Sequence, residues 1–193
     1  MELLEQRILR EGKVRPGGIL KVDSFLNHQI DPQLLYEMAC ELKRLYEGEG
    51  VNKIFTIEAS GIAIASLAGY VFGCPVVFAK KSNTAVLGSE TVQAGVYSFT
   101  HKTQNTIRIE RRYLPEGSRV LIIDDFLADG QAVKGMMNLC EQQKATVIGV
   151  GIAVEKGFQP GGQQLREAGV RVKSLAIVER IENGKIILRS DDD

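Results

Sequence analysis

Residues 120–132 read VLIIDDFLADGQA. The four apolar residues Val120 to Ile123 are typical of a buried parallel strand, because they leave no polar face for solvent. Two carboxylates, Asp124 and Asp125, follow directly, and Gly130 begins a segment of helical length. A turn that opens a helix presents unpaired backbone N–H groups and the positive end of the helix dipole. The stretch therefore predicts a strand, a turn suited to a phosphate group, and a helix.

Short apolar runs on both sides of this stretch alternate with segments of helical length. A short amphipathic helix is expected at the N-terminus, ending before Arg15-Pro16-Gly17-Gly18. Asp31 followed by Pro32 predicts the start of a helix that runs to Glu47. Strands are predicted at 53–57, 75–79, 120–123, 146–154 and 170–178, and further helices at 60–72, 130–143 and 161–168. The alternation indicates an α/β fold, a central and mostly parallel sheet flanked by helices, with ligands expected beyond the carboxyl ends of the strands.

Residues 80–112 interrupt the alternation. Two β-rich pieces, 91–100 and 106–111, are joined by the polar residues 101–105, and we expect an antiparallel hairpin laid over the sheet. A long polar loop in a compact α/β domain is more often functional than idle. We therefore expect residues 82–105 to form a mobile lid.

Composition limits the kinds of partner. The chain has 193 residues, 24 Lys and Arg against 24 Asp and Glu, and three scattered cysteines. A chain of this length and balance predicts a single domain, residues 1–193, without a nucleic-acid or membrane partner. No run approaches the roughly 18 apolar residues of a membrane span or the pattern of a secretory signal. The expected location is the cytoplasm, where the thiols stay reduced.

A lone Asp-Asp pair at the end of a strand is more often a polar surface turn, but the whole of 120–132 is more specific. It resembles the signature of type I phosphoribosyltransferases that binds 5-phosphoribosyl 1-diphosphate (PRPP). The resemblance implies the type I fold, with Asp124 and Asp125 beneath the ribose. It also implies Mg²⁺ held mainly through PRPP, without dedicated protein ligands. The residues implied for the 5′-phosphate loop are Ala128, Asp129, Gly130, Gln131 and Ala132.

Asp129 stands where that family usually has Thr, Ser or Asn. A carboxylate aimed at a phosphate would be repelled, so we expect its side chain to turn aside, as a helix cap.

Two other strand ends complete the PRPP side of the resemblance. Residues 58–61, Glu-Ala-Ser-Gly, follow the strand 53–57 and by themselves fit an ordinary turn. The resemblance assigns Ala59, Ser60 and Gly61 to the diphosphate. Lys80 and Lys81 follow the next strand, and twin lysines are usually solvated surface charge. At this sheet edge we expect both to neutralise the diphosphate.

The base side is predicted from a lysine and an aromatic residue. Lys156 ends a strand and offers a donor to a carbonyl oxygen, and Phe158 suits stacking on a flat ring, which together favour an oxopurine over adenine. Residues 20–30 resemble the matching segment of bacterial xanthine phosphoribosyltransferases, which implies that Leu20 and Asn27 contact the base. The base pocket is expected under a small hood formed by about residues 1–30 and the C-terminal part of the chain.

Within the lid, Tyr97 and Ser98 belong to a run similar to the mobile loop of adenine and xanthine phosphoribosyltransferases. Thr100 stands where adenine enzymes have a Glu, and Ala128 where hypoxanthine-guanine enzymes have an Asp. Xanthine loses a proton more readily than adenine, so an anionic base paired with Lys156 needs no strong base in the protein. The prediction is therefore transfer from PRPP to xanthine, giving xanthosine monophosphate and diphosphate.

Two alternatives remain. One is an adenine or hypoxanthine-guanine phosphoribosyltransferase, against which Thr100 and Ala128 count. The other is a PRPP-sensing regulator without catalysis. Such regulators carry an added winged-helix module, for which the first 30 or so residues leave too little room. Family resemblance also implies a homodimer.

Overall fold

The computed structural model describes residues 1–81, 90–98 and 103–189. Its main sheet has six strands in the order β10-β9-β8-β7-β3-β4. These are Lys185–Leu188 (β10), Val172–Glu182 (β9), Thr146–Lys156 (β8), Arg119–Leu127 (β7), Lys53–Ile57 (β3) and Val76–Ala79 (β4). All neighbours are parallel except β10, which runs antiparallel to β9. The predicted mostly parallel α/β sheet is confirmed.

The strand order reverses between β3 and β7, because β4 follows β3 outward on one side while β8 and β9 follow β7 on the other. Such a switch point opens a crevice beyond the carboxyl ends of the two central strands. The fold thus brings the segments after Ile57 and around Asp124 to one place.

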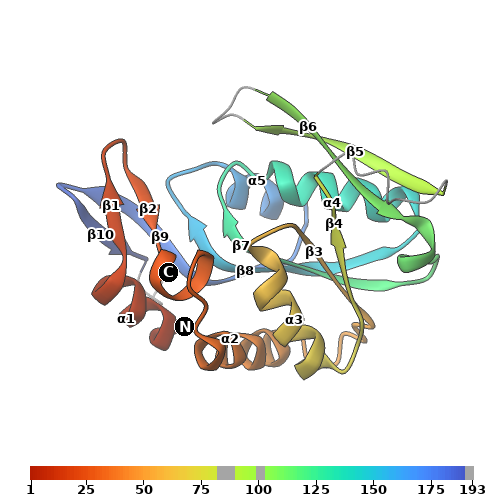
Figure 1. Ribbon diagram of the computed structural model, residues 1–193, viewed down its shortest axis with the longest axis horizontal. Coiled ribbons are helices and arrows are strands. Elements are labelled where there is room, and N and C mark those ends of the chain that lie inside the picture. Colours follow the sequence, from red (N-terminus) through yellow and green to blue (C-terminus); the bar gives the residue numbers. More distant parts are fainter. Residues whose placement is uncertain (82–89, 99–102, 190–193) are drawn as a thin grey trace.

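Helices cover both faces of the sheet (Figure 1). Glu2–Glu11 (α1), Pro32–Leu45 (α2) and Gly61–Phe72 (α3) lie on one face, and Gln131–Gln142 (α4) and Gly161–Glu167 (α5) lie on the other. Alternate residues of β7 face the two layers: Leu121 and Ile123 pack with α2 and α3, whereas Val120 and Ile122 pack with α4. Both sides of the strand are buried, which explains the continuous apolar run from which it was predicted.

The start of α2 follows its sequence signals. The Asp31 carboxylate accepts a hydrogen bond from the backbone N–H of Leu34 at 3.2 Å, and Pro32 occupies the first turn. Both features are as predicted, because an N-cap oxygen satisfies one of the otherwise unpaired N–H groups of the first turn.

The N-terminal segment forms a hairpin that its sequence did not predict. Lys13–Arg15 (β1) pairs with Ile19–Lys21 (β2), and a one-turn π-helix, Asp23–Asn27 (η1), follows. Gly17 and Gly18 have φ of +86° and +70°, a backbone conformation that suits glycine in the tight turn. The Met1 amino group donates to the carbonyl of Leu175 at 2.5 Å, so this segment lies against the C-terminal strands.

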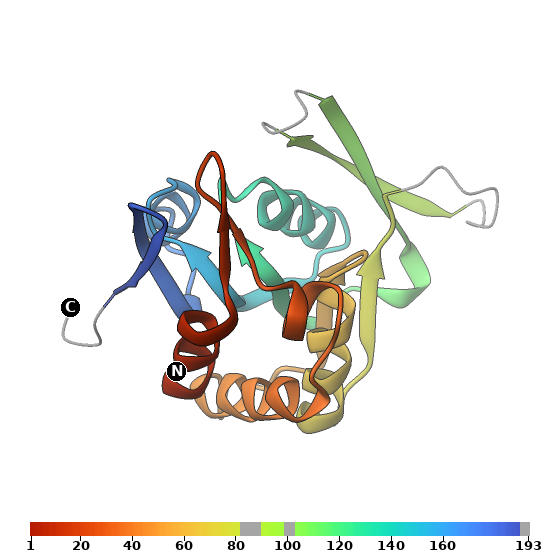
Figure 2. The same cartoon turned by 60° about the vertical axis from the view of Figure 1, so that its left-hand side comes forward.

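A second hairpin, Thr91–Ser98 (β5) and Thr103–Glu110 (β6), rises from the other end of the sheet (Figure 2). It is antiparallel as predicted, but it lies over α4 rather than directly on the sheet. A Cβ built on Gly135 of α4 would reach a side-chain methyl of Val96 in β5 at 2.5 Å, so the glycine permits this close packing. The hairpin joins the sheet edge through a bridge between Lys80 and Arg108.

Much of the predicted lid falls on residues 82–89 and 99–102, which lie outside the described residues, as do the side chains of Tyr97 and Ser98. A short 3₁₀ turn, Arg111–Tyr113 (η2), leads from β6 toward β7. In the ranges described, no helix combines the length and apolar character that crossing a bilayer requires.

Candidate active site

The loop after β3 and the acidic pair of β7 touch at the switch point. A Cβ built on Gly61 would clash with the hydroxyl of Thr56 and lie 3.1 Å from a carboxylate oxygen of Asp124. Only glycine lets the segment assigned to the diphosphate approach the segment assigned to the ribose this closely. The Thr56 hydroxyl is buried and has no hydrogen-bond partner among the described residues.

Asp124 and Asp125 lie inside β7, not after its end. The predicted strand stopped at Ile123, whereas the observed strand continues to Leu127, because the pairing with β8 extends past the two carboxylates. The two side chains are only 5% and 7% exposed. Asp124 accepts a hydrogen bond from the backbone N–H of Asp125 at 3.0 Å. The strand thus holds both carboxylates at fixed positions beside the switch point.

The environment of Asp124 disfavours its charge. Burial and then the neighbouring charge of Asp125 raise the pKa of Asp124 well above its ordinary value, and the Lys81 ammonium acts in the opposite direction. A bound group carrying hydroxyl donors or positive charge would relieve this cost. The pair is therefore a candidate site for such a ligand.

Residues 128–132 form the turn between β7 and α4. Gly130, with φ of +80°, precedes the first residue of the helix. The Asp129 carboxylate accepts a hydrogen bond from the backbone N–H of Gln131 at 3.1 Å. As the sequence predicts, this side chain turns aside, but the residue at the N-cap of α4 is Gly130 and not Asp129.

A glycine pair at the start of α5 packs against this turn. The N–H of Gly161 donates to the carbonyl of Ala128 at 3.0 Å. A Cβ on Gly161 would clash with the Ala128 carbonyl and lie 2.5 Å from the backbone nitrogen of Gly130. Our sequence interpretation assigned Gly161 only to a crossover helix. The available signal was the run Pro-Gly-Gly at 160–162, directly after the segment assigned to the base.

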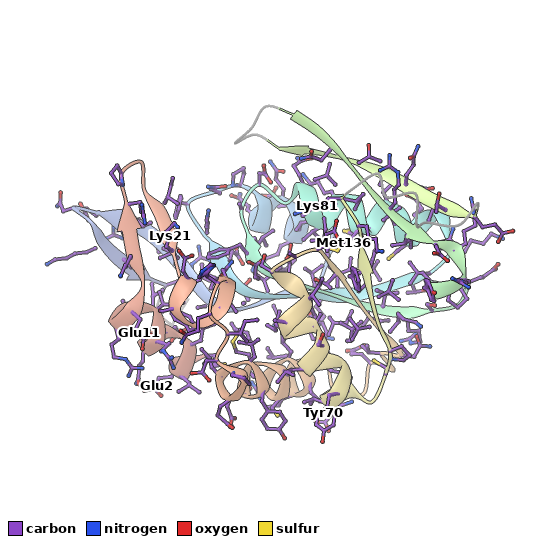
Figure 3. All side chains as sticks on the ribbon, in the orientation of Figure 1. Glu2, Glu11, Lys21, Tyr70, Lys81 and Met136 are labelled. Carbon is purple, nitrogen blue, oxygen red and sulfur yellow. The ribbon has the colours of Figure 1, made fainter. Side chains whose placement is uncertain are left out.

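The two lysines at the end of β4 differ in surroundings. Lys81 is exposed, its backbone N–H donates to the Glu58 carboxylate at 2.5 Å, and its charge acts on Asp124. Lys80 instead pairs its backbone with Arg108 of the hairpin and lines a cavity of about 480 Å³ at the outer edge of β4. Figure 3 marks Lys81 where the chain leaves β4. Of the two lysines, Lys81 is thus the one whose charge acts on the acidic pair. The peptide bond before Ala59 is cis.

On the base side, the π-helix η1 brings Asn27 to the acidic pair. The Asn27 amide donates to the Asp125 carboxylate at 2.5 Å, and its buried carbonyl oxygen has no partner among the described residues. Leu20 is buried in β2. The Asn27 oxygen is therefore an unused acceptor beside the ribose carboxylates.

Lys156 ends β8 with its ammonium 5.4 Å from the centre of the Phe126 ring. Phe126 directly follows the acidic pair in the chain, so Lys156 lies against the strand that carries this pair. Phe158 is 45% exposed in the turn after β8. Our sequence interpretation missed Phe126 because it ended the strand before the acidic pair. The signal was the run Phe-Leu, which extends the apolar pattern beyond Asp125.

The acidic pair fits a cation held mainly through a phosphorylated ligand. One oxygen of Asp124 and one of Asp125 already accept hydrogen bonds from protein groups. No cluster of three potential metal ligands occurs within residues 1–81, 90–98 and 103–189. Mg²⁺ commonly keeps several waters and binds through one or two carboxylates plus substrate phosphates.

Comparison with known proteins gives the family. A model described as phosphoribosyl transferase domain matches residues 22–180. Xanthine phosphoribosyltransferase 1 of Clostridium perfringens is 52% identical over 98% of this chain and 100% of its own length. Xanthine phosphoribosyltransferase of Ligilactobacillus salivarius is 45% identical over the whole of both chains.

Solved structures agree in fold. Adenine phosphoribosyltransferase of Rhodothermus marinus has a TM-score of 0.75 at 20% identity, covering 90% of this chain and 98% of its own. The enzyme of the same name from Trypanosoma brucei has a TM-score of 0.77 at 16% identity, covering 94% and 82%. These likenesses establish the type I phosphoribosyltransferase fold. Together with the matched model and the near full-length relatives, they show that the chain belongs to the phosphoribosyltransferase family.

Proposed function

We propose that the protein transfers the phosphoribosyl group of PRPP to N9 of xanthine, giving xanthosine 5′-monophosphate and diphosphate. Two contacts near the acidic pair carry the proposal: Asn27 donates to Asp125, and the Lys156 ammonium lies over the ring of Phe126, the next residue of the chain. In this proposal the Lys156 ammonium and the unused carbonyl oxygen of Asn27 face the base. The names of the near full-length relatives support the same substrate.

PRPP occupies the crevice at the switch point in this proposal. Asp124 and Asp125 accept hydrogen bonds from the ribose hydroxyls, and the backbone N–H groups of residues 128–132 bind the 5′-phosphate at the start of α4. The diphosphate lies between Gly61 and Lys81. Mg²⁺, when bound to PRPP, neutralises part of the phosphate charge.

The base is held by one hydrogen-bond donor and one acceptor. The Lys156 ammonium donates to a carbonyl oxygen of xanthine, and the Asn27 oxygen accepts from a ring N–H. An adenine amino group would face the Lys156 donor without an acceptor, which disfavours that base. Leu20 and Phe158 supply apolar contacts.

The reaction is a substitution at C1 of the ribose. N9 of xanthine forms the new bond to C1, the bond from C1 to the diphosphate oxygen breaks, and the diphosphate leaves with the electron pair. The purine proton passes to solvent, or is already absent when xanthine binds as an anion beside Lys156. Positive charge develops on the sugar during the substitution, and the carboxylates of Asp124 and Asp125 stabilise it. Catalysis here is mainly positioning and charge stabilisation.

The test is incubation with PRPP, Mg²⁺ and one purine base at a time, with diphosphate release as the measurement. Release with xanthine, and much less with adenine, hypoxanthine or guanine, is the expected result. Release with adenine alone would contradict the assignment of the base. No release with any base, despite PRPP binding, would point to a sensor instead of an enzyme.

We also propose that the protein acts as a homodimer in the cytoplasm. Large side chains remain exposed on α2 and α3, with Tyr36 at 40% and Tyr70 at 79%, and such exposed aromatic residues suit a subunit interface. All three cysteines are free, as in a reducing compartment. The mass in solution, measured by light scattering during gel filtration, tests the dimer: about twice 21.2 kDa is expected, and 21.2 kDa would contradict it.

A further inference from the structure

An ion pair joins the end of β8 to α5, close to the turn formed by residues 128–132; its carboxylate is buried, whereas the Arg166 side chain is 36% exposed. Glu155, near the end of β8, is 2% exposed. Arg166 of α5 donates to both of its carboxylate oxygens, at 2.7 and 2.6 Å, and the hydroxyl of Ser174 in β9 donates to one of them. Burial alone would raise the pKa of Glu155, but the hydrogen bonds from Arg166 and Ser174 outweigh it and hold that pKa below its ordinary value. The carboxylate is thus ionised at neutral pH.

The ion pair fixes α5 relative to the sheet. Glu155 pairs in register with Leu127, the residue immediately before the turn, so it lies at the same level of the sheet. A Cβ built on Gly162 would clash with the Glu155 carboxylate and lie 2.8 Å from the Arg166 guanidinium. The first turn of α5 therefore lies directly over the ion pair, and a side chain at position 162 would displace the two charged groups.

The first turn of α5 in turn supports residues 128–132. Gly161 donates its N–H to the carbonyl of Ala128, and the Cα of Gly161 faces Gly130 at a distance that leaves little room for any side chain. On the outer side, the Lys134 ammonium of α4 donates to the side-chain carbonyl of Gln164 in α5 at 2.8 Å. A continuous path of contacts runs from Glu155 through α5 to the backbone that would hold the phosphate.

Such an ion pair is poorly explained by stability alone. The cost of burying the Glu155 carboxylate offsets much of the attraction, and a guanidinium that is partly exposed to water adds little net stability. A bidentate guanidinium–carboxylate contact does, however, define the direction and distance between its two elements better than apolar packing does. In the proposed function, residues 128–132 bind through backbone N–H groups, and such binding depends on the position of the backbone. The ion pair next to them defines that position.

We propose that Glu155 and Arg166 are positioning residues that set the geometry of the 5′-phosphate loop, residues 128–132, through the first turn of α5. The inference rests on the proposed function, because it assigns that loop to the phosphate of PRPP. Glu155 and Arg166 do not touch the substrate. They act through Gly161 and Gly162.

The test compares variants by KM for PRPP, KM for xanthine, kcat, and the Kd for ribose 5-phosphate measured calorimetrically without base. Arg166→Met should raise the KM for PRPP and the Kd for ribose 5-phosphate about tenfold or more, since small displacements of a binding group are costly. The KM for xanthine should stay within about twofold, because successive side chains of β8 point to opposite faces of the sheet, so Lys156 points away from α5. Arg166→Lys should recover part of the loss, because a lysine restores the charge but not the two-point contact.

The double variant Glu155→Leu/Arg166→Met separates an effect on the geometry of residues 128–132 from an effect on the stability of the fold. It leaves no unpaired buried charge, so its Tm should stay near that of the wild type or exceed that of Arg166→Met, while the KM for PRPP stays raised. If Arg166→Met does not fold, this variant decides the question. A double variant with the wild-type KM for PRPP would overturn the proposal.

The matched control is Arg44→Met. Arg44 makes a bidentate contact with Glu41, at 2.8 Å for each bond, but on the exposed face of α2. All the kinetic constants should stay unchanged, and an equal rise in the KM for PRPP would contradict a specific role for Glu155 and Arg166. Failure of the proposed function looks different. A wild type that transfers nothing to any base, with variants that still weaken ribose 5-phosphate binding, would uphold the positioning and reject the reaction.

Discussion

The proposed phosphate side of the site consists mainly of backbone groups, whereas its proposed base side consists of single side chains. Around residues 128–132 the chain offers backbone N–H groups, and glycines at 130 and 161 let main chain pack against main chain. Around Asn27 and Lys156 the chain offers single side chains, brought from the N-terminal segment and from the end of β8. The phosphate side should therefore respond most strongly to added atoms, and the base side to lost functional groups.

The largest effect is expected for Gly161→Ala. The added methyl group would clash with the carbonyl of Ala128, and neither backbone has room to yield. We expect kcat/KM for PRPP to fall about a hundredfold, because misplacement of a binding loop by an ångström has an effect of that order. Steady-state kinetics with varied PRPP measure it.

Gly69→Ala is the control for crowding alone. Its added methyl group would meet a side-chain methyl of Val76 inside the layer of α3, far along the helix from the switch point. It should lower the Tm and leave the KM for PRPP unchanged. An equal loss of kcat/KM for PRPP in both variants would show that crowding alone reduces activity, and would contradict a special sensitivity of the phosphate side.

The next effect concerns Asp124→Asn. Removing a ribose carboxylate should lower kcat/KM for PRPP at least about tenfold, the range of a lost hydrogen bond to a charged group.

The same substitution, Asp124→Asn, should increase the stability of the free protein. Burial and the charge of Asp125 raise the pKa of Asp124, so the folded state holds its proton more tightly than the unfolded state does. That advantage is full below the ordinary pKa of 3.8 and is lost as pH rises through the raised pKa.

Thermal unfolding of the free protein between about pH 4 and 8 checks this sign. The Tm of Asp124→Asn should exceed that of the wild type, by a margin that grows with pH. Asp31→Asn is the opposite control. The backbone N–H of Leu34, and then Arg7, lower the pKa of Asp31, so its contribution is present above the ordinary pKa and lost as pH falls. Its variant should be less stable at neutral pH, and a gain there would contradict the reasoning.

On the base side, Lys156→Ala should reduce the preference for xanthine over hypoxanthine at least about tenfold, since it removes a charged donor. The ratio of kcat/KM for the two bases measures the effect, and the KM for PRPP should change little. An unchanged ratio would rule out the proposed role of Lys156.

The smallest effect is expected for Asp129→Asn. The side chain already turns away to accept the N–H of Gln131, and an asparagine oxygen can accept the same bond while removing a negative charge near the phosphate. The KM for PRPP should stay within about twofold of the wild type or fall. A large loss of activity would contradict this placement of residues 128–132.

The contrast between the two sides also explains what the sequence could reveal. The run 120–132 is local, so its strand, acidic pair, turn and helix were predictable, and the alternating runs gave the parallel sheet. The extension of β7 to Leu127 was missed because the carboxylates look like a strand end, although pairing with β8 continues past them. Phe126 was missed for the same reason.

Contacts between distant segments were out of reach of local patterns. The hydrogen bond from Asn27 to Asp125 joins residues 98 positions apart. It depends on the π-helix η1, which the spacing of apolar residues does not predict. The difference between Lys80 and Lys81 arises from a backbone bridge to the hairpin. The close contacts at Gly161 and Gly162 arise only when α5 packs on the turn after β7 and over Glu155.

The most direct test of the central claim is a competition. The protein is given Mg²⁺, limiting PRPP and equal amounts of xanthine, hypoxanthine, guanine and adenine, and the nucleotides formed are identified by mass. Xanthosine 5′-monophosphate should be the dominant product. A mixture dominated by the nucleotide of another base, or consumption of PRPP without any nucleotide, would contradict the account.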